Sequence, residues 1–511
     1  MRGLPRTGTT RSTVVRTLRS GAVRGLLIPA SSFVVLPVLL SSLGPRRYGI
    51  WATLSSLLAV GGLVDAGVRS EIVRRVARGH GAGDLAAGLR SARQGVTIVA
   101  LGSAAVAAVV CALSAQIVGF TFPGLPPADS GQVRGVLIAL AVILALTVTN
   151  AGAFGIAAGL QRGDIENFAT ILAALSGAVT MVIAVRLLDF GLHGMVAGSV
   201  VSTTVLVLAQ QYAASRLTPT NRWPFARVTH RVVRGYLGVS GLLFVSQLAD
   251  VVDVQFDKVV LSKLVDSAAV TQYQIGTMLS LNLRVLALIP VAVLLAGITE
   301  LWVRDRHRAE RLMATVTQLT YLLGGVLMTG VVVFAEPFVT LWLGEGYEQA
   351  VTAARLLAVA MAVNLVGAPW GSYAIGRGWP AMAAWSASAN MVVNAVVSWT
   401  LVARIGFDGA LLGSLAGNIT GVLVLCALLT RATRRDWLLP AARPVAICLA
   451  LGTLTLSLLH RFVSQPGWLT FVALSVGFAL VLVAALFASS PRWLREDAAR
   501  VYRSARGQRG T

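Results

Sequence analysis

Long apolar runs, separated by short charged or Gly/Pro-rich segments, occupy most of this chain. An α-helix rises about 1.5 Å per residue, so about 20 apolar residues cross the roughly 30 Å hydrocarbon core of a bilayer. The pattern predicts an all-α polytopic membrane protein with fourteen transmembrane helices. The predicted spans are 21–43, 49–67, 95–115, 133–158, 168–188, 192–213, 237–256, 273–298, 314–334, 351–374, 380–403, 408–429, 444–460 and 468–488.

Composition supports the assignment to membrane proteins, and the cysteines indicate no cofactor site. The chain has 511 residues, of which 56% are hydrophobic and 13% charged, and its mean hydropathy is +0.76. These values lie outside the range of soluble proteins. The three cysteines, Cys111, Cys426 and Cys448, all lie in apolar runs, so we predict no disulfide framework, no metal site and no cofactor.

The net charge of +22 comes almost entirely from arginine, and its placement sets the predicted topology. Thirty-three of the 43 basic residues lie in the N-tail, every second loop and the C-tail, whereas seven lie in the opposite set of loops. Basic residues concentrate on the cytoplasmic side, so we predict a cell-membrane protein with both termini in the cytoplasm. Basic residues on the cytoplasmic side also contact anionic lipid, which accounts for the large positive net charge. The net charge therefore does not indicate nucleic-acid binding, which we do not expect.

An internal repeat at an offset of 215 residues organises the spans. It places Arg162-Gly163 on Arg377-Gly378, residues 190–199 on 405–414, and Arg16 and Arg19 on Arg231 and Arg234. These matches predict two parallel six-helix repeats that form two lobes around a central cavity, followed by two C-terminal helices. The predicted parts are an N-tail (1–20), an N-lobe (21–214), a cytoplasmic linker (215–236), a C-lobe (237–430), two further spans (431–488) and a C-tail (489–511).

Arg284 lies near the middle of the predicted span 273–298, where a guanidinium costs about 2.5–3.5 kcal/mol on insertion scales. At 100° per residue, Tyr273, Thr277, Ser280 and Arg284 share one stripe of the helix. The stripe could line a cationic transport path, to which we also assign Arg24 of the first span. The alternative is that Arg284 pairs structurally with an acid on a neighbouring helix.

Acidic residues form a second stripe on the predicted span 237–256. Asp250 and Asp253 lie deep in the span, whereas Asp257 is expected at the outer surface in an exposed pair with Lys258. Carboxylates on one face within a membrane hold a proton, a cation or an arginine. We predict that Asp250 and Asp253 bind a coupling ion or proton, with structural pairing to Arg284 or Arg24 as the alternative.

Several motifs give the chain a resemblance to a known family. Ser42–Trp51 followed by Leu63–Val68, Asp257-Lys258 with Tyr273, and Glu336–Phe338 leading to Leu343–Tyr347 resemble, as an ordered set, the oligosaccharide flippases of the polysaccharide transporter family. That family is part of the multidrug/oligosaccharidyl-lipid/polysaccharide exporter superfamily. Arg46-Arg47 departs from the family pattern, which usually carries acids there.

The resemblance implies a transporter, not an enzyme, that flips a polyprenyl-diphosphate-linked oligosaccharide across the membrane by alternating access for cell-surface polysaccharide biosynthesis. The implied partners are the lipid-linked glycan, membrane lipids and possible polymerases or glycosyltransferases. Two alternatives are a drug/cation antiporter of the same superfamily and, more remotely, a membrane glycosyltransferase. Asparagines would face the glycan or, alternatively, form interhelical hydrogen bonds. The candidate amides are Asn150, Asn282, Asn364, Asn390, Asn394 and Asn418.

Overall fold

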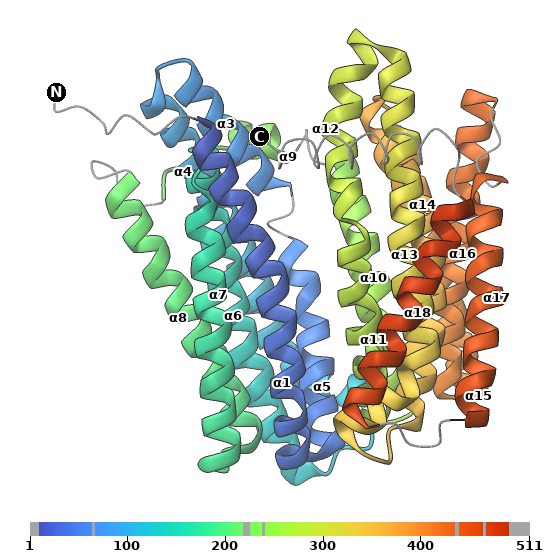
Figure 1. The fold of residues 1–511 in the computed structure, drawn as a ribbon. Helices are drawn as coiled ribbons and strands as arrows, with labels where there is room; N and C mark the ends of the chain where they lie inside the picture. Colours follow the sequence, from blue (N-terminus) through green and yellow to red (C-terminus); the bar gives the residue numbers. More distant parts are fainter. Residues whose placement is uncertain are drawn as a thin grey trace, which may run out of the picture. The chain divides into compact units, whose positions relative to one another are not determined.

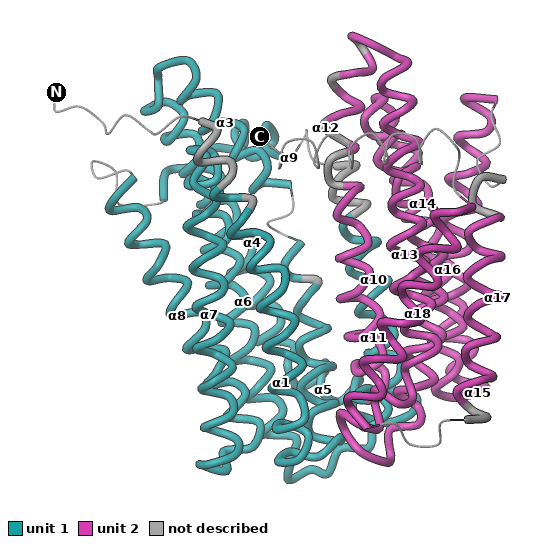
Figure 2. The backbone as a smooth tube through the Cα atoms, in the orientation of Figure 1, with its two compact units in different colours: residues 1–271 teal, residues 272–511 magenta. Residues whose placement is uncertain are grey.

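A computed structural model describes residues 10–63, 67–217, 225–237, 241–434, 439–462 and 467–489. Figure 1 shows that these residues are almost entirely helical, and no β-strand occurs among them. The chain forms two compact units, Met1–Thr271 and Gln272–Thr511 (Figure 2).

The first unit packs its helices around apolar clusters that α6 shares with its neighbours. Leu54 of α1, Leu137 of α6 and Leu192 of α8 belong to one of these clusters and are almost completely buried. Its elements are α1 (Thr10–Ala59), η1 (Val60–Gly62), α3 (Val68–Gly81), α4 (Leu85–Ala112), α5 (Ser114–Thr121), α6 (Pro127–Gly159), α7 (Gly163–Val182), the π-helix η2 (Ile183–Leu187), α8 (Gly191–Leu217), α9 (His230–Leu237), α10 (Gly241–Leu264) and the start of α11 (Ser267–Ala287).

The second unit has one apolar cluster among α12, α13, α14 and α16, and another among α13, α17 and α18. Trp370 of α14 and Leu294 of α12 are almost fully buried in the first of these clusters. Besides the rest of α11, its helices are α12 (Ile289–Arg304), α13 (Arg306–Leu343), α14 (Glu348–Gly376), α15 (Pro380–Ile405), α16 (Phe407–Thr433), α17 (Leu439–Phe462) and α18 (Trp468–Ser489).

Where the structure describes them, the fourteen predicted spans fall on helices. In the part of the chain that the structure describes, ten helices are long and apolar enough to cross a membrane. The helix α1 carries the first predicted span and most of the second. Between these two spans its helical geometry is interrupted at Gly44, which has a φ of 75° and precedes Pro45. The remaining predicted spans fall on α10, α11 with α12, and α17.

The predicted span 273–298 is not one continuous helix. The helix α11 ends at Ala287 and α12 begins at Ile289, with Leu288 between them. Pro290 explains the break, because it has no N–H to donate to the carbonyl of Leu286 and its ring disfavours a continuous helix. The Val291 N–H instead bonds to the Leu288 carbonyl at 3.0 Å, in a tighter turn.

The internal repeat is visible in the backbone, but its offset changes along the chain. The N–H of Arg162 bonds to the Ala157 carbonyl, and that of Trp379, 217 positions later, bonds to the Ala374 carbonyl. The turn after α6 therefore superposes on the turn after α14 at an offset of 217 residues. The predicted offset of 215 residues had matched Arg162 with Arg377, and the backbone does not support that match. In the next loop, Gly191 and Gly406 both have positive φ at the offset of 215. The π-helix η2, whose wider turn holds extra residues, lies between the two loops.

The compact units do not divide at the predicted linker. The helix α10, which begins the predicted C-lobe, belongs to the first unit and packs against α1 and α5. Residues of the predicted linker also contact the first unit, since the Tyr236 hydroxyl of α9 donates to the Ser91 carbonyl at 2.6 Å. The predicted boundary between the two lobes stays a prediction. Residues 1–9 of the predicted N-tail (1–20) and residues 490–511 of the predicted C-tail (489–511) lie outside the described residues.

Candidate functional site

A series of hydrogen bonds in the second unit connects α11, α14 and α16 at Arg284. The Arg284 Nε–H donates to the side-chain oxygen of Asn364 at 3.0 Å, and the Asn364 amide donates to the Asn418 oxygen at 2.9 Å. The Asn418 amide then donates to the Ser414 carbonyl at 2.9 Å. Each amide accepts at its oxygen and donates at its nitrogen, which fixes its orientation. We call Arg284, Asn364, Asn418 and Ser414 the polar network.

The other members of the predicted polar stripe are buried between helices. Tyr273, Thr277 and Ser280 are 2%, 7% and 1% exposed. The Tyr273 hydroxyl lies 3.3 Å from the Ser414 hydroxyl, and the Ser280 hydroxyl lies 3.1 Å from the Ala354 carbonyl of α14, to which it donates. Small polar side chains of this kind let membrane helices approach closely and bond to one another. In this structure they hold α11 against α14 and α16, and substrate contact by this stripe stays a prediction.

Asn390 and Asn394 lie on α15 at its interface with α16. The Asn394 side chain is fully buried, and its oxygen accepts a hydrogen bond from the Ser398 hydroxyl at 2.8 Å. A Cβ atom added at Gly417 of α16 would lie 2.4 Å from the Asn390 oxygen and 2.8 Å from the Asn394 Cβ. The hydrogen bond from Ser398 to Asn394 lies within α15, and both asparagines pack against Gly417 of α16. Glycan contact by Asn390 and Asn394 stays a prediction. Asn282 is half-buried on α11.

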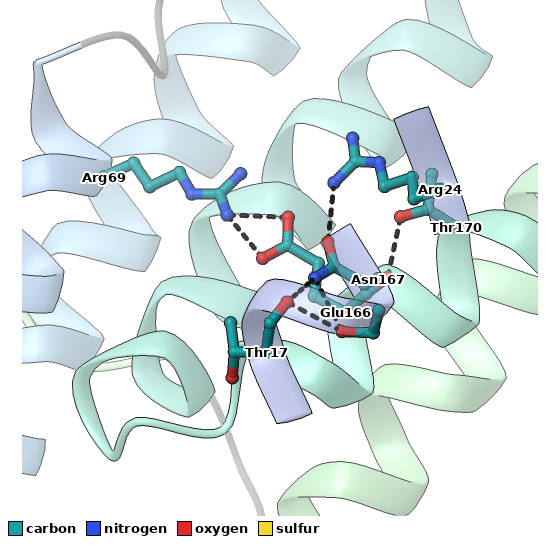
Figure 3. Close-up of polar contacts among 7 residues, drawn as sticks. Thr17, Arg24, Arg69, Glu166, Asn167 and Thr170 are labelled. Carbon is teal, nitrogen blue, oxygen red and sulfur yellow. Dashed lines mark hydrogen bonds and ion pairs between the residues drawn. The ribbon is translucent and has the colours of Figure 1, made fainter. Parts of the chain in front are cut away.

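Arg24 belongs to a separate polar cluster in the first unit (Figure 3). One of its terminal N–H groups donates to the Asn167 oxygen at 3.3 Å, and the Asn167 amide donates to the Ser20 hydroxyl at 3.0 Å. Beside them, one terminal N–H group of Arg69 of α3 donates to both carboxylate oxygens of Glu166, at 2.6 Å to Oε1 and 2.5 Å to Oε2. The first turn of α7 therefore holds arginines from α1 and α3 together.

The partners of Arg24 and Arg69 in this cluster were not predicted from the sequence. The available signal was the pair of acids Asp164 and Glu166, which directly precede the predicted span 168–188. Asp164 accepts from Arg162 at 3.0 Å and lies 3.8 Å from Arg16. Acids in the first turn of a helix are also favoured by the helix dipole, so their position alone did not indicate that they bind arginines of other helices.

The acidic stripe lies on α10 of the first unit. Asp250 is exposed and Asp253 is half-buried, and the ion-coupling role of both stays a prediction. The expectation of an exposed pair at Asp257 and Lys258 is wrong, because these residues are 0% and 5% exposed. The Lys258 ammonium donates to the Gln255 side-chain oxygen at 2.9 Å, within the same helix.

The fold matches solved transporter structures. The chain aligns with an inward-facing multidrug resistance MATE transporter of the MOP superfamily at a TM-score of 0.67 and 16% identity, covering 87% of this chain and 100% of that one. It aligns with the lipid II flippase MurJ in an inward closed conformation at a TM-score of 0.67 and 12% identity, covering 93% and 99%. A third match is an outward-facing MATE transporter, at 0.57 and 14% identity, covering 88% and 96%.

These likenesses define an all-α, multi-pass membrane protein with the fold of the MOP superfamily. The family model described as "Polysaccharide biosynthesis protein" matches residues 39–352, which is more than half of the chain. The chain therefore belongs to that family. No curated protein matches the sequence.

Proposed function

We propose that this protein flips a polyprenyl-diphosphate-linked oligosaccharide from the cytoplasmic to the outer leaflet of the cell membrane. The observation that carries the proposal is membership of the polysaccharide biosynthesis family over residues 39–352, on a fold shared with a lipid II flippase. The fold alone does not choose a substrate, because it serves more than one function. Family and fold together favour movement of a lipid-linked glycan without covalent chemistry by the protein.

The polar network supplies groups that suit such a substrate. A guanidinium binds phosphate oxygens through charge-assisted hydrogen bonds, and amides bond to sugar hydroxyl groups. The Asn364 oxygen accepts from the Arg284 Nε–H and so contributes to the orientation of the guanidinium. In the first unit, the Asn167 oxygen accepts from a terminal N–H of Arg24. We assign Arg284 to the diphosphate, and Arg24 of the first unit stays a candidate for binding substrate.

A cavity in the second unit suits the lipid part. It has a volume of about 240 Å³ and lies among α13, α14 and α17. Its walls are almost entirely apolar and include Met328, Val363, Leu449 and Leu456. An apolar cavity of this kind takes a hydrocarbon chain without leaving polar groups unsatisfied. We assign it to part of the polyprenyl chain.

Energy for directional transport would come from an ion or proton gradient through Asp250 and Asp253 of α10. Both termini are assigned to the cytoplasm by the arginine distribution. Polymerases and glycosyltransferases that use the same glycan would be the functional partners.

The test is flipping by the purified full-length protein in vesicles. A fluorescent polyprenyl-diphosphate oligosaccharide is placed in the inner leaflet, and its arrival outside is measured with an impermeant quencher, with and without an ion gradient. We expect faster arrival than in protein-free vesicles. Arrival at the protein-free rate, from protein that remains folded, would contradict the proposal.

A drug/cation antiporter is the second candidate function. The observation that favours it is the match to a MATE transporter, whose TM-score of 0.67 equals that of the flippase. Uptake of a cationic dye into the same vesicles under an ion gradient separates the two. Dye transport without glycan flipping would support the antiporter.

A further inference from the structure

A second cationic site lies in the second unit, at the turn between α14 and α15. The guanidinium carbon of Arg377 lies 4.0 Å from the ring centroids of Trp302 and of Trp379. One terminal N–H donates to the Tyr373 hydroxyl at 3.2 Å, and that ring meets Trp302 edge to face. The guanidinium is therefore held by aromatic rings from α12, α14 and the α14–α15 turn, a geometry that arginine's flat cation favours.

The aromatic rings do not neutralise the charge of Arg377. In the part of the chain that the structure describes, no carboxylate lies within ion-pair distance of Arg377, and its buried Nε–H has no acceptor. A second cation, Arg306, lies 5.1 Å from the Trp302 centroid and is paired with Glu310 at 3.3 Å. Two positive charges thus share one indole ring, and only Arg306 has a carboxylate partner there.

The first unit provides an internal comparison. The turn between α6 and α7 has the same backbone hydrogen bonds as the turn between α14 and α15. In the first unit, Asp164 lies in the first turn of α7 and accepts from Arg162 at 3.0 Å. The first turn of α15 contains no acid, and Ala381 stands 217 positions after Asp164. The turn of the first unit thus has a carboxylate, Asp164, beside its arginine, Arg162. The turn of the second unit has Arg377 and no acid in the first turn of α15.

We propose that Arg377 and the rings of Trp302, Tyr373 and Trp379 bind the phosphate group of a lipid at the membrane surface. The site follows the predicted span 351–374, so it lies at the depth where tryptophan and tyrosine gather and where lipid phosphates are found. The arginine distribution places this loop on the cytoplasmic side, whose leaflet carries anionic lipids. The guanidinium donates to the phosphate oxygens while its flat faces remain stacked on the indoles.

The phosphate could belong to an anionic phospholipid or to the diphosphate of a lipid-linked substrate. Full-length protein is purified in detergent and offered either phosphatidylglycerol or undecaprenyl diphosphate, and the bound lipid is measured by native mass spectrometry. Phosphatidylcholine, which is zwitterionic, is the reference lipid. Neither measurement requires transport, so failure of this proposal is distinct from failure of the proposed function.

Arg377→Gln is expected to weaken binding of at least one of the two lipids about tenfold. Arg162→Gln is the matched control, because it removes the same charge from the corresponding turn of the first unit, where Asp164 already neutralises the arginine. We expect near wild-type binding for this control. The lipid that Arg377→Gln affects identifies the source of the phosphate.

A second measurement separates lipid binding from a purely structural role of Arg377. If Arg377 binds lipid, added lipid should raise the melting temperature of the wild-type protein, because a ligand that binds the folded state stabilises it. Arg377→Gln should lose this increase, whatever its own melting temperature. If Arg377→Gln does not fold, Ala381→Asp places an acid in the first turn of α15, four residues from Arg377, at the position equivalent to Asp164. Weaker lipid binding is expected for this variant too, because the added negative charge repels phosphate. Unchanged lipid binding in the folded variant, or an equal loss in Arg162→Gln, would overturn the proposal.

Discussion

Arginine side chains within and beside the helices of this protein are held by three kinds of partner. Glu71 holds Arg74 and Arg75 through a carboxylate, Asn364 holds Arg284 through an amide, and aromatic rings hold Arg377. Only the carboxylate cancels the charge. An amide or an aromatic ring positions a guanidinium without cancelling its charge. Arg377, which has no carboxylate within ion-pair distance among the described residues, is therefore a candidate for binding an anion.

Arg284 should act through its positive charge. We expect Arg284→Lys to keep partial flipping activity and Arg284→Ala to lose most of it, at wild-type membrane abundance, in the vesicle assay. A purely structural arginine would behave differently, because its removal leaves buried polar partners unsatisfied at a cost of about 1–3 kcal/mol. Abundance would then fall with activity. Restored abundance in the double variant Arg284→Ala with Asp250→Asn would favour a structural pair.

Asn364 tests the polar network itself. Asn364→Leu removes the acceptor for Arg284 and the donor to Asn418 while keeping a similar volume. We expect flipping to fall about tenfold with the protein still folded, since the guanidinium loses its orientation. The control is Thr352→Leu, at an exposed position of α14 outside the network. Equal activity of the two variants would contradict a positioning role for Asn364.

Glu71 gives a prediction about pH. Burial raises the pKa of the Glu71 carboxyl, but hydrogen bonds and charge from Arg74 and Arg75 outweigh it, so the pKa lies below its ordinary value. A lowered pKa stabilises the folded state above the unfolded-state pKa, which is about 4.3 for glutamate, and this stabilisation is lost as the pH falls through the folded pKa. We expect Glu71→Gln to lower the melting temperature at pH 7 but not at the lowest pH where wild type still folds. The control is Glu348→Gln, outside this cluster. A constant difference across pH would contradict this assignment.

At the scale of helices, each of the ten described helices that are long and apolar enough to cross a membrane carries at least one span predicted from a hydrophobic run. Twenty apolar residues have few alternatives to a transmembrane helix. The local signals for breaks were Pro290 and Gly44, and their effect depends on the surrounding packing. The face of each helix was harder to predict. Asn390 and Asn394 were predicted as substrate-facing amides, and the structure places both against glycines of α16. Their contact with substrate stays a prediction, because polar residues in a membrane serve helix packing as readily as binding.

The contact between α15 and α16 depends on glycines of α16. A Cβ atom added at Gly413 would lie 2.0 Å from the Ser398 hydroxyl oxygen and 2.7 Å from the Ser398 backbone nitrogen, so the backbone would have to move. We expect Gly413→Ala to destabilise the folded protein by about 1–3 kcal/mol, measured as a lower melting temperature in detergent. The control is Gly330→Ala in α13, where an added Cβ meets nothing within 4 Å. Equal melting temperatures of the two variants would show that this close contact carries no stability.

At the scale of the whole molecule, repetition and charge could be read from the sequence, whereas the contacts that form the polar network could not. The network joins residues 284, 364 and 418, which are far apart in the chain and carry no common motif. Asn364 and Asn418 were among the candidate amides, but six candidates allow many pairings. The compact units also differ from the predicted lobes, because the place of α10 depends on its packing with α1.

Topology can be tested with single cysteines in a variant that lacks Cys111, Cys426 and Cys448. Ala82, in the turn between α3 and α4, and Ser130, at the start of α6, are both exposed, and α4 separates them. Of the arginines and lysines, 33 lie on the side predicted to be cytoplasmic and seven on the opposite side. This distribution assigns Ala82 to the cytoplasm and Ser130 to the outside. In intact cells, an impermeant thiol reagent should label Ser130→Cys and not Ala82→Cys, and permeabilised cells should label both.

The packing of α9 extends this prediction to the linker between the predicted lobes. Tyr236 bonds to the Ser91 carbonyl, and the Gln94 side chain bonds to the Arg227 carbonyl, so the linker residues 225–237 lie on the same side of the membrane as the α3–α4 turn. A cysteine at His230, an exposed position, should therefore label like Ala82→Cys. Labelling of His230→Cys like Ser130→Cys would contradict both the packing and the six-helix repeat, because six spans return the chain to its starting side. Labelling of all three sites in intact cells would overturn the charge-based orientation.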